Sequence, residues 1–365
     1  MTLSDFDAYR PENEPRRKKR RTRPPGQRRG GGAGDGSREM PMVEDVEFAD
    51  SYYGRPIVKP PPWDDKISAY LFLGGIAGGS AMLAIGADRI GFDKLRRNTR
   101  LTALGATIAG TGFLVADLGR PERFHHMMRT FKPASPMNMG TWILSAFGVG
   151  AGVVAAIDVD RMTGQKIPLG VLRPIVYAFE KPAGLLAALM GAPLASYTGA
   201  LLADTSVPTW NGGKDNLSYL FVSSAAMASS GVALLTTPTS ETRPARVFAT
   251  LGAASELYFS EKLTADMHPV EAEPLQTGRP ARKLRWAQAL TIAGGVGAAL
   301  LGRNRIAAMA SGAALASASY LTRSAILEAG INSTKDPRHV VEPQRDRLAA
   351  RRAQGIVDDS ITTVG

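Results

Sequence analysis

The sequence contains no cysteine and only four histidines, at positions 125, 126, 268 and 339. Without thiolates the protein forms no disulfide and cannot bind an iron–sulfur cluster in the usual way. A membrane haem of the b type takes two histidines from helices inside the bilayer, whereas these four fall in expected loops or in the C-terminal tail. We therefore expect neither a haem nor an iron–sulfur cluster in this protein.

The sequence also lacks the nucleotide-binding pattern G-x-x-x-x-G-K-[ST], the metalloprotease pattern H-E-x-x-H and any repeat of 20 to 50 residues. Polarity is concentrated in the two tails and a few loops, and between residues 66 and 323 there are several apolar segments of about 20 residues, the length that crosses a bilayer core. Backbone polar groups in lipid must be satisfied within each segment, so segments of this length form helices. The sequence predicts an all-α membrane protein.

Eight transmembrane helices are predicted. They cover residues 66–87, 99–116, 137–157, 182–203, 216–237, 244–263, 286–302 and 306–321. The last two are short and are separated only by Arg303, Asn304 and Arg305. Two arginines at mid-bilayer would be costly, so we expect a tight hairpin here and not one long helix.

The first predicted helix contains two overlapping Gly-x-x-x-Gly pairs, Gly74/Gly78 and Gly75/Gly79. Such pairs allow helices to approach closely, and we favour this packing role over contact with a ligand.

Residues 1–62 are rich in arginine, lysine, glycine and proline, and we expect a disordered basic tail. No apolar segment follows the arginines closely enough for a signal peptide. Beside a membrane domain at residues 63–323, this tail is expected to contact anionic lipid and not nucleic acid. Residues 324–365 form a C-terminal tail. The larger share of the 44 lysines and arginines falls on the face shared by both tails, so both termini are predicted to be cytoplasmic, at the inner membrane.

The most polar connection is residues 117–142, DLGRPERFHHMMRTFKPASPMNMGTW. It follows the second predicted helix and holds an acid, several basic residues, a histidine pair and proline turns. One interpretation is a basic loop that faces lipid headgroups. The mixture of residue types favours the other, an ordered loop with fixed polar contacts that serves a ligand or a partner protein.

Three polar residues inside predicted helices are candidates for function. Tyr70 and Tyr197 lie toward the cytoplasmic ends of the first and fourth helices, where a lone tyrosine is ordinary but paired phenols can hold carbonyl groups. Glu256 lies well inside the sixth helix and is a candidate proton relay, the alternative being a carboxylate paired with Lys262. Glu180, at the start of the fourth helix, is expected to pair with its neighbour Lys181.

Three stretches together resemble the NrfD/polysulfide-reductase C family, which comprises quinone-binding membrane subunits of respiratory oxidoreductases. They are YLFLGGIAGGSA at 70–81, the loop at 117–142 and YTGALLADTSVPTWN at 197–211, within a resemblance that covers residues 63–347. The family implies two four-helix bundles in tandem and a menaquinone or ubiquinone site near the cytoplasmic face. The quinone-binding residues that the resemblance implies are Tyr70, Tyr197, His125, His126, Lys66, Asp117 and Arg120. The residues expected to dock a partner are Arg123, Arg129, Trp210 and Asn211.

Because this protein has no redox centre of its own, electrons must pass through partners. The resemblance implies a four-cluster iron–sulfur subunit and a molybdopterin catalytic subunit, so the catalytic centre lies outside this protein. Formate oxidation is favoured by the cytoplasmic face, and polysulfide, thiosulfate, nitrite or sulfoxide chemistry is equally permitted by the family. The alternatives are a secondary transporter, whose helices also carry glycine breaks and buried carboxylates, and a passive anchor without quinone chemistry.

Overall fold

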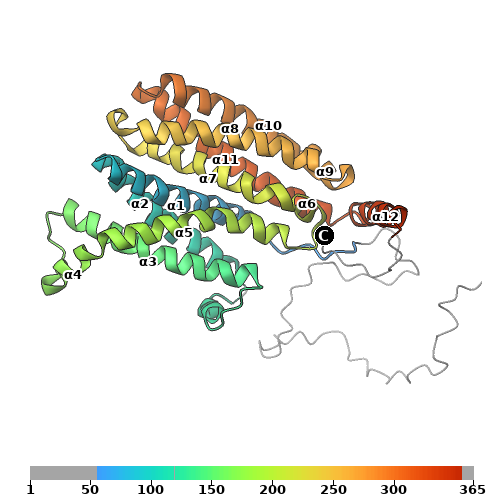
Figure 1. The fold of residues 1–365 in the computed structure, drawn as a ribbon, viewed down its shortest axis with the longest axis horizontal. Helices are drawn as coiled ribbons and strands as arrows, with labels where there is room; N and C mark the ends of the chain where they lie inside the picture. Colours follow the sequence, from blue (N-terminus) through green and yellow to red (C-terminus); the bar gives the residue numbers. More distant parts are fainter. Residues whose placement is uncertain (1–55, 119, 356–365) are drawn as a thin grey trace, which may run out of the picture. The chain divides into compact units, whose positions relative to one another are not determined.

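The computed structural model describes residues 56–118 and 120–355, apart from the side chain of Arg123. Most of the predicted disordered tail, residues 1–55 of 1–62, and the end of the predicted C-terminal tail, residues 356–365, lie outside the described residues. Every regular element in the described part is a helix, which confirms the predicted all-α class (Figure 1).

Eight helices of the described part are 19 to 29 residues long. They are α1 (Asp65–Arg89), α2 (Asp93–Asp117), α3 (Pro136–Met162), α5 (Glu180–Ala203), α7 (Lys214–Thr236), α8 (Arg243–Asp266), α10 (Gly278–Val296) and α11 (Arg305–Ser333). Six of them, α1, α2, α3, α5, α7 and α10 with its continuation, are also apolar enough to cross a membrane. The structure therefore has the helices of a multi-pass membrane protein.

Shorter helices connect the long ones or follow them. They are η2 (Pro121–Met128), η3 (Gly170–Leu172), α4 (Arg173–Ala178), α6 (Pro208–Gly212), η4 (Thr239–Glu241), α9 (Pro269–Gln276), the π-helical turn η5 (Gly297–Leu301) and α12 (Arg338–Ala353).

Each predicted segment lies on one of the eight long helices, but the last two helices are longer than expected. The helix α10 begins at Gly278, and α11 continues past residue 321 to Ser333. The predicted hairpin between them is confirmed, because the π-helical turn ends at Leu301 and α11 starts at Arg305. Asn304 caps the start of α11, because its side chain accepts hydrogen bonds from the first backbone N–H groups of this helix.

The long helices contact one another in two groups. The first group contains α1, α2, α3 and α5, and the second contains α7, α8, α10 and α11. The two groups meet where α7 packs against α1 and α5. Glycines make the closest approaches, since a Cβ on Gly78 of α1 would meet the backbone of Gly191 on α5, and one on Gly231 of α7 would meet Gly312 on α11. The close packing predicted for Gly78 is confirmed.

Within the first group, consecutive helices run in opposite directions, so the start of one helix lies beside the end of the next. Tyr70, near the start of α1, contacts Tyr197, near the end of α5, and the Tyr197 ring packs on Gly140 at the start of α3. At the other end, Arg100 near the start of α2 binds Glu180 at the start of α5. The first group therefore has a tyrosine end and a charged end.

Candidate functional site

The structure brings together the two tyrosines that the sequence singled out. The hydroxyls of Tyr70 on α1 and Tyr197 on α5 are hydrogen-bonded to each other. Tyr70 is only 6% exposed, and Tyr197 is half-buried. A Cβ on Gly140 would collide with the Tyr197 ring, while one on Gly110 of α2 would lie 3.7 Å from the Tyr70 ring. Gly140 on α3 therefore makes room for the Tyr197 ring, a role that sequence reasoning missed, whereas a side chain at Gly110 would only touch the Tyr70 ring.

Charged residues cap this end of α1. Asp64 precedes the helix and accepts a hydrogen bond from the backbone N–H of Lys66, with 2.7 Å between nitrogen and oxygen. This hydrogen bond lowers the pKa of the Asp64 carboxyl below its ordinary value. The Lys66 ammonium lies 3.1 Å from the same carboxylate, and Asp117 at the end of α2 is within electrostatic reach of both. Lys66 is one helical turn from Tyr70, so a charged cap lies next to the phenol pair.

The loop between α2 and α3 has fixed polar contacts, as the sequence predicted. The Asn138 side chain on α3 donates to the carbonyls of Met127 and Thr130 and accepts from the backbone N–H of Lys132. The Trp142 indole also donates to the Thr130 carbonyl, at 3.2 Å. These contacts fix the loop to the first turns of α3.

The predicted loop residues lie on this ordered segment. His125 and His126 are exposed on η2, with ring centroids 4.4 Å apart in an edge-to-face arrangement. Arg120 precedes η2 and is half-buried, and Arg129 follows it and is exposed. The side chain of Arg123 lies outside the described residues. A quinone or docking role for these residues stays a prediction.

The structure places Trp210 and Asn211 on α6, close to the same end of the molecule. Trp210 is only 1% exposed, stacks on Trp63 with centroids 5.4 Å apart, and donates through its indole N–H to the carbonyl of Ile326. The half-buried Asn211 donates to the carbonyl of Ala203. The indole thus packs inside the protein, and a docking role for α6 stays a prediction that rests on its outer surface.

A second polar cluster lies inside the second group. Glu256 on α8 is 3% exposed and accepts a hydrogen bond of 2.6 Å from the Thr322 hydroxyl on α11. The neighbouring Arg323 is fully buried and donates to the carbonyls of Leu71 on α1 and Phe221 on α7. Its guanidinium also lies over the Phe221 ring, 4.5 Å from the centroid. The cluster therefore ties α8 and α11 to α1 and α7.

Sequence reasoning missed Arg323, because it placed the end of the last transmembrane helix at residue 321. The apolar residues after Arg323 could have shown that the helix continues past it. An arginine in the middle of a long membrane helix must point inward to find partners. The alternative partner suggested for Glu256, Lys262, has no hydrogen bond or ion pair with it in the described residues.

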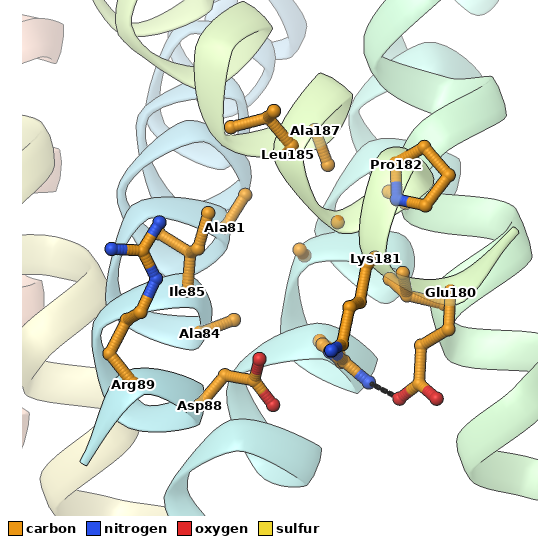
Figure 2. Close-up of a pocket in the computed structure, with 15 residues that line it drawn as sticks. Ala81, Ala84, Ile85, Asp88, Arg89, Glu180, Lys181, Pro182, Leu185 and Ala187 are labelled. Carbon is orange, nitrogen blue, oxygen red and sulfur yellow. Dashed lines mark hydrogen bonds and ion pairs between the residues drawn. The ribbon is translucent and has the colours of Figure 1, made fainter.

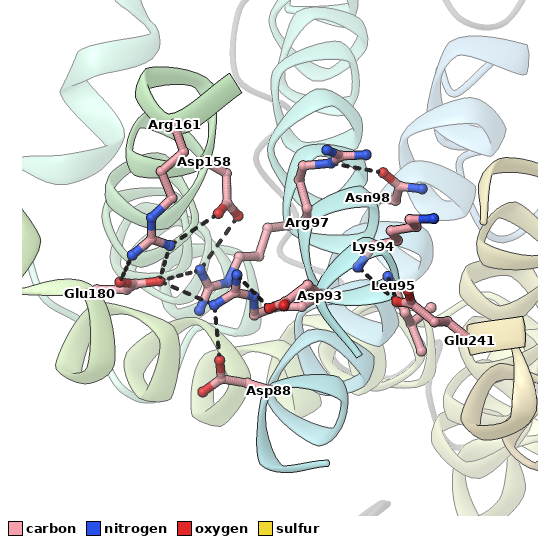
Figure 3. Close-up of polar contacts among 12 residues, drawn as sticks. Asp88, Asp93, Lys94, Leu95, Arg97, Asn98, Asp158, Arg161, Glu180 and Glu241 are labelled. Atoms are coloured by element: carbon pink, nitrogen blue, oxygen red, sulfur yellow. Dashed lines mark hydrogen bonds and ion pairs between the residues drawn. The ribbon is translucent and has the colours of Figure 1, made fainter. Parts of the chain in front are cut away.

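The opposite end of the first group carries a network of charges (Figure 3). Arg100 on α2 is 6% exposed and lies 2.8 Å from Glu180 on α5 and 3.4 Å from the buried Asp158 on α3. Arg161 binds the second oxygen of Glu180 at 2.6 Å. The predicted pair of Glu180 with Lys181 is therefore wrong, because arginines from two other helices occupy the carboxylate.

The helices that can cross a membrane define a multi-pass membrane protein. At one end of them, the Tyr70–Tyr197 pair and the charged residues beside it form a polar site near one surface. Comparison of the sequence with known proteins identifies the family. The chain belongs to the polysulphide reductase NrfD family, whose pattern matches residues 57–246, so the predicted family is confirmed.

Individual relatives agree with this assignment. The chain is 31% identical over 190 residues to a protein described as a NrfD homolog from Haemophilus influenzae, which covers 47% of this chain and 57% of the relative. It is 32% identical over 192 residues to protein NrfD of Escherichia coli, covering 47% and 58%. The C component of polysulfide reductase from Wolinella succinogenes is 27% identical over 150 residues, covering 39% and 47%. The chain thus spans a little over half the length of the first two relatives.

Proposed function

We propose that this protein is the quinone-binding membrane subunit of a respiratory oxidoreductase, with the site at the tyrosine end of the first helix group. The observation that carries the proposal is the contact between Tyr70 and Tyr197, which come from helices α1 and α5 and are 127 residues apart in the sequence. Two phenol donors at one buried point suit a carbonyl acceptor, and family membership supports this ligand class.

The residues present fit a quinone headgroup. The two phenols bind each other here, so a carbonyl oxygen takes the place of one hydroxyl as acceptor and separates the rings slightly. Gly140 holds the Tyr197 ring against α3, which limits where its hydroxyl points. On the side of the charged cap, Asp117 supplies a carboxyl group that exchanges protons with water, and Lys66 supplies a positive charge.

A bound quinone would supply two-electron, two-proton chemistry, and the protein's own residues would orient the headgroup and handle the protons. The phenols donate hydrogen bonds to the carbonyls, while Asp117, Arg120, His125 and His126 close the site toward water. Glu256 is proposed to take up and release a proton in the second group, where one oxygen of the resting carboxylate accepts a hydrogen bond from the Thr322 hydroxyl and the other has no partner among the described residues.

Electrons reach this site through partners, because the protein has no cysteine. The relative from Wolinella succinogenes is named as one lettered component of a reductase, which supports a complex of several proteins. We propose a four-cluster iron–sulfur subunit docked near the tyrosine end and a molybdopterin catalytic subunit beyond it. Formate oxidation is the favoured overall reaction, and polysulfide, thiosulfate, nitrite or sulfoxide reduction fits the family as well. The proposed docking residues are Arg123, Arg129 and Asn211, whereas the buried Trp210 holds α6 in place beneath that surface.

We propose that all eight long helices cross the inner membrane as two four-helix bundles, with both termini in the cytoplasm. The helices α8 and α11 are 24 and 29 residues long, which exceeds the roughly 20 residues that a bilayer needs. Each carries a buried charged residue, Glu256 on α8 and Arg323 on α11, which lowers its apolar character.

The tyrosines are tested by quinol-dependent turnover of the purified complex, measured against quinone concentration. One lost hydrogen bond costs about 0.5–1.5 kcal/mol, so Tyr70→Phe and Tyr197→Phe should each weaken quinone affinity about two- to tenfold. Tyr197→Leu should weaken it more, because the ring that packs on Gly140 is also lost.

The matched control is Tyr219→Phe, which removes the hydroxyl of an exposed tyrosine on α7. Dye-linked activity of the catalytic subunit reports whether the complex is intact. Unchanged quinone kinetics in Tyr70→Phe, Tyr197→Phe and Tyr197→Leu, with dye-linked activity preserved, would exclude the phenol pair as the site.

A further inference from the structure

A pocket of about 370 Å³ lies at the charged end of the first helix group (Figure 2). Its walls come from the last turns of α1 and the first turns of α2 and α5, with α3 behind. The volume is within the range of sites that bind small organic ligands. The proposed quinone site lies at the other end of the same helices, so this pocket has no role in the function proposed above.

The two ends are separated by close packing. One helical turn beyond the pocket residues Ala81 and Ala187, a Cβ on Gly78 would meet the carbonyl of Gly191. The backbones of α1 and α5 are therefore in contact between the pocket and the tyrosine pair. The pocket ends at this contact, so it is a binding site in its own right and does not continue along this interface to the phenols.

Its charges are unbalanced in favour of cations. Three basic residues and two acidic residues line it: Arg89, Arg100, Lys181, Asp88 and Glu180. Both acids are already paired with arginines, Asp88 with Arg96 at 3.2 Å and Glu180 with Arg100 at 2.8 Å. Arg89 and Lys181 are exposed, and neither has a hydrogen bond or ion pair within the part of the protein that the structure describes. Figure 2 shows them on two sides of the pocket. Two cations therefore remain for an anionic ligand.

The rest of the wall is apolar and belongs to helices that can cross a membrane. It includes Ala84, Ile85 and Leu185, the last of which is 46% exposed. We propose that the pocket binds an anionic phospholipid, with the phosphate between Arg89 and Lys181 and the start of an acyl tail against these apolar residues. A free phosphate would leave the apolar wall uncovered, and an uncharged quinone would leave both cations unpaired.

The experiment is lipid titration of the purified full-length protein in detergent, followed by native mass spectrometry. The wild type should bind phosphatidylglycerol more tightly than phosphatidylcholine with the same acyl tails. The double variant Arg89→Ala/Lys181→Ala should bind phosphatidylglycerol about thirtyfold more weakly, which is about 2 kcal/mol at about 1.4 kcal/mol per factor of ten. Phosphatidylcholine has the same phosphate, but its choline cation offsets the attraction to Arg89 and Lys181, so its binding should fall by much less.

The matched control is Lys94→Ala/Arg303→Ala, which removes one lysine and one arginine, both exposed and both outside the pocket. It should keep phosphatidylglycerol affinity within about threefold. If both double variants lost the same phosphatidylglycerol affinity, the loss would be due to general surface charge, and the proposal would be overturned. Inorganic phosphate and a short-tailed quinone are tested as competitors at the same concentration as the lipid. If either displaced the lipid, the proposal of a phospholipid ligand would be overturned in favour of that competitor. Thermal unfolding checks that each variant is folded, and Arg89→Gln/Lys181→Gln replaces the alanine variant if that one is not recovered.

Discussion

Arg323 and Glu256 place opposite charges inside the second helix group, where neither side chain is more than 3% exposed. A buried charge without compensation costs several kcal/mol, and carbonyl acceptors offset only part of that cost. Arg323 has such acceptors on two helices, and Glu256 accepts a hydrogen bond from the Thr322 hydroxyl. We infer that the two charges also stabilise each other across the α8–α11 interface.

This coupling is measurable with a double-mutant cycle. Arg323→Met should lower the free energy of unfolding by about 3–5 kcal/mol, since it leaves the Glu256 carboxylate buried alone. Adding Glu256→Gln should restore part of the loss, with a coupling energy of about 0.5–3 kcal/mol. The measurement is reversible unfolding in mixed detergent, with Arg303→Met on the exposed turn as the control. Additive effects of the two substitutions would show that the charges are independent.

Individual site residues differ in how far the sequence predicts them. Tyr70 and Tyr197 are predicted as functional because the sequence around them resembles a family, but their contact depends on how α1 and α5 pack. The sequence pairs Glu180 with its neighbour Lys181, since sequence shows adjacency and not the arginines that other helices supply. It leaves Arg323 outside the last membrane helix for the same reason, because the partners of this arginine lie about 250 and 100 residues away in the sequence.

At the scale of the helix, α1 packs through different glycines on different sides. A Cβ on Gly78 would meet the backbone of α5, and one on Gly79 would meet Ser229 of α7. Gly75 lies against the Arg323 guanidinium. A Cβ on Gly74, by contrast, would have no atom within 4 Å. The overlapping Gly-x-x-x-Gly pairs are thus unequal in their contribution to packing.

Matched valine substitutions test this difference. Gly78→Val should destabilise the protein by about 1–3 kcal/mol or more, because the added atoms force two backbones apart. Gly74→Val, in the same helix and with the same change in residue type, should have a much smaller effect. Thermal unfolding of both variants in the same detergent makes the comparison. Equal loss of stability would mean that helix propensity, and not the α1–α5 contact, dominates.

The sequence predicts the position of a helix well where its length and apolar residues determine it. It predicts the position less well where contacts with other parts of the protein set the helix ends. The segments at 66–87 and 182–203 match α1 and α5 closely, because about 20 apolar residues leave a polypeptide in lipid few alternatives. The sequence predicts the start of α2 six residues late, at residue 99 and not at Asp93. Its first turn is polar and is stabilised by Glu241, which accepts hydrogen bonds from the backbone N–H groups of Lys94 and Leu95 (Figure 3).

At the scale of the whole molecule, the residues that follow the membrane helices add a folded layer near the tyrosine end. The helix α12 is tied to α9 by the ion pair of Arg347 with Glu271 and by that of Arg338 with Glu273. His268, which caps α9, lies 3.0 Å from Asp346 of α12. Most of the described part of the predicted C-terminal tail is therefore helical, and it enlarges the surface where we propose that a partner subunit docks.

The orientation of this surface can be read with single cysteines, because the protein has none of its own. Val171 in the connection between α3 and α5 is 86% exposed, and Gln354 is exposed at the end of α12. In intact cells Val171→Cys should react with a membrane-impermeant maleimide, whereas Gln354→Cys should react only after permeabilisation. This expectation follows from the lysine and arginine bias, which predicts that the face of both termini is cytoplasmic. Labelling of both variants in detergent is the control for access. The reverse pattern would move the tyrosine end and its docking surface outside the cytoplasm, and labelling of both from the same side would rule out the eight-helix topology.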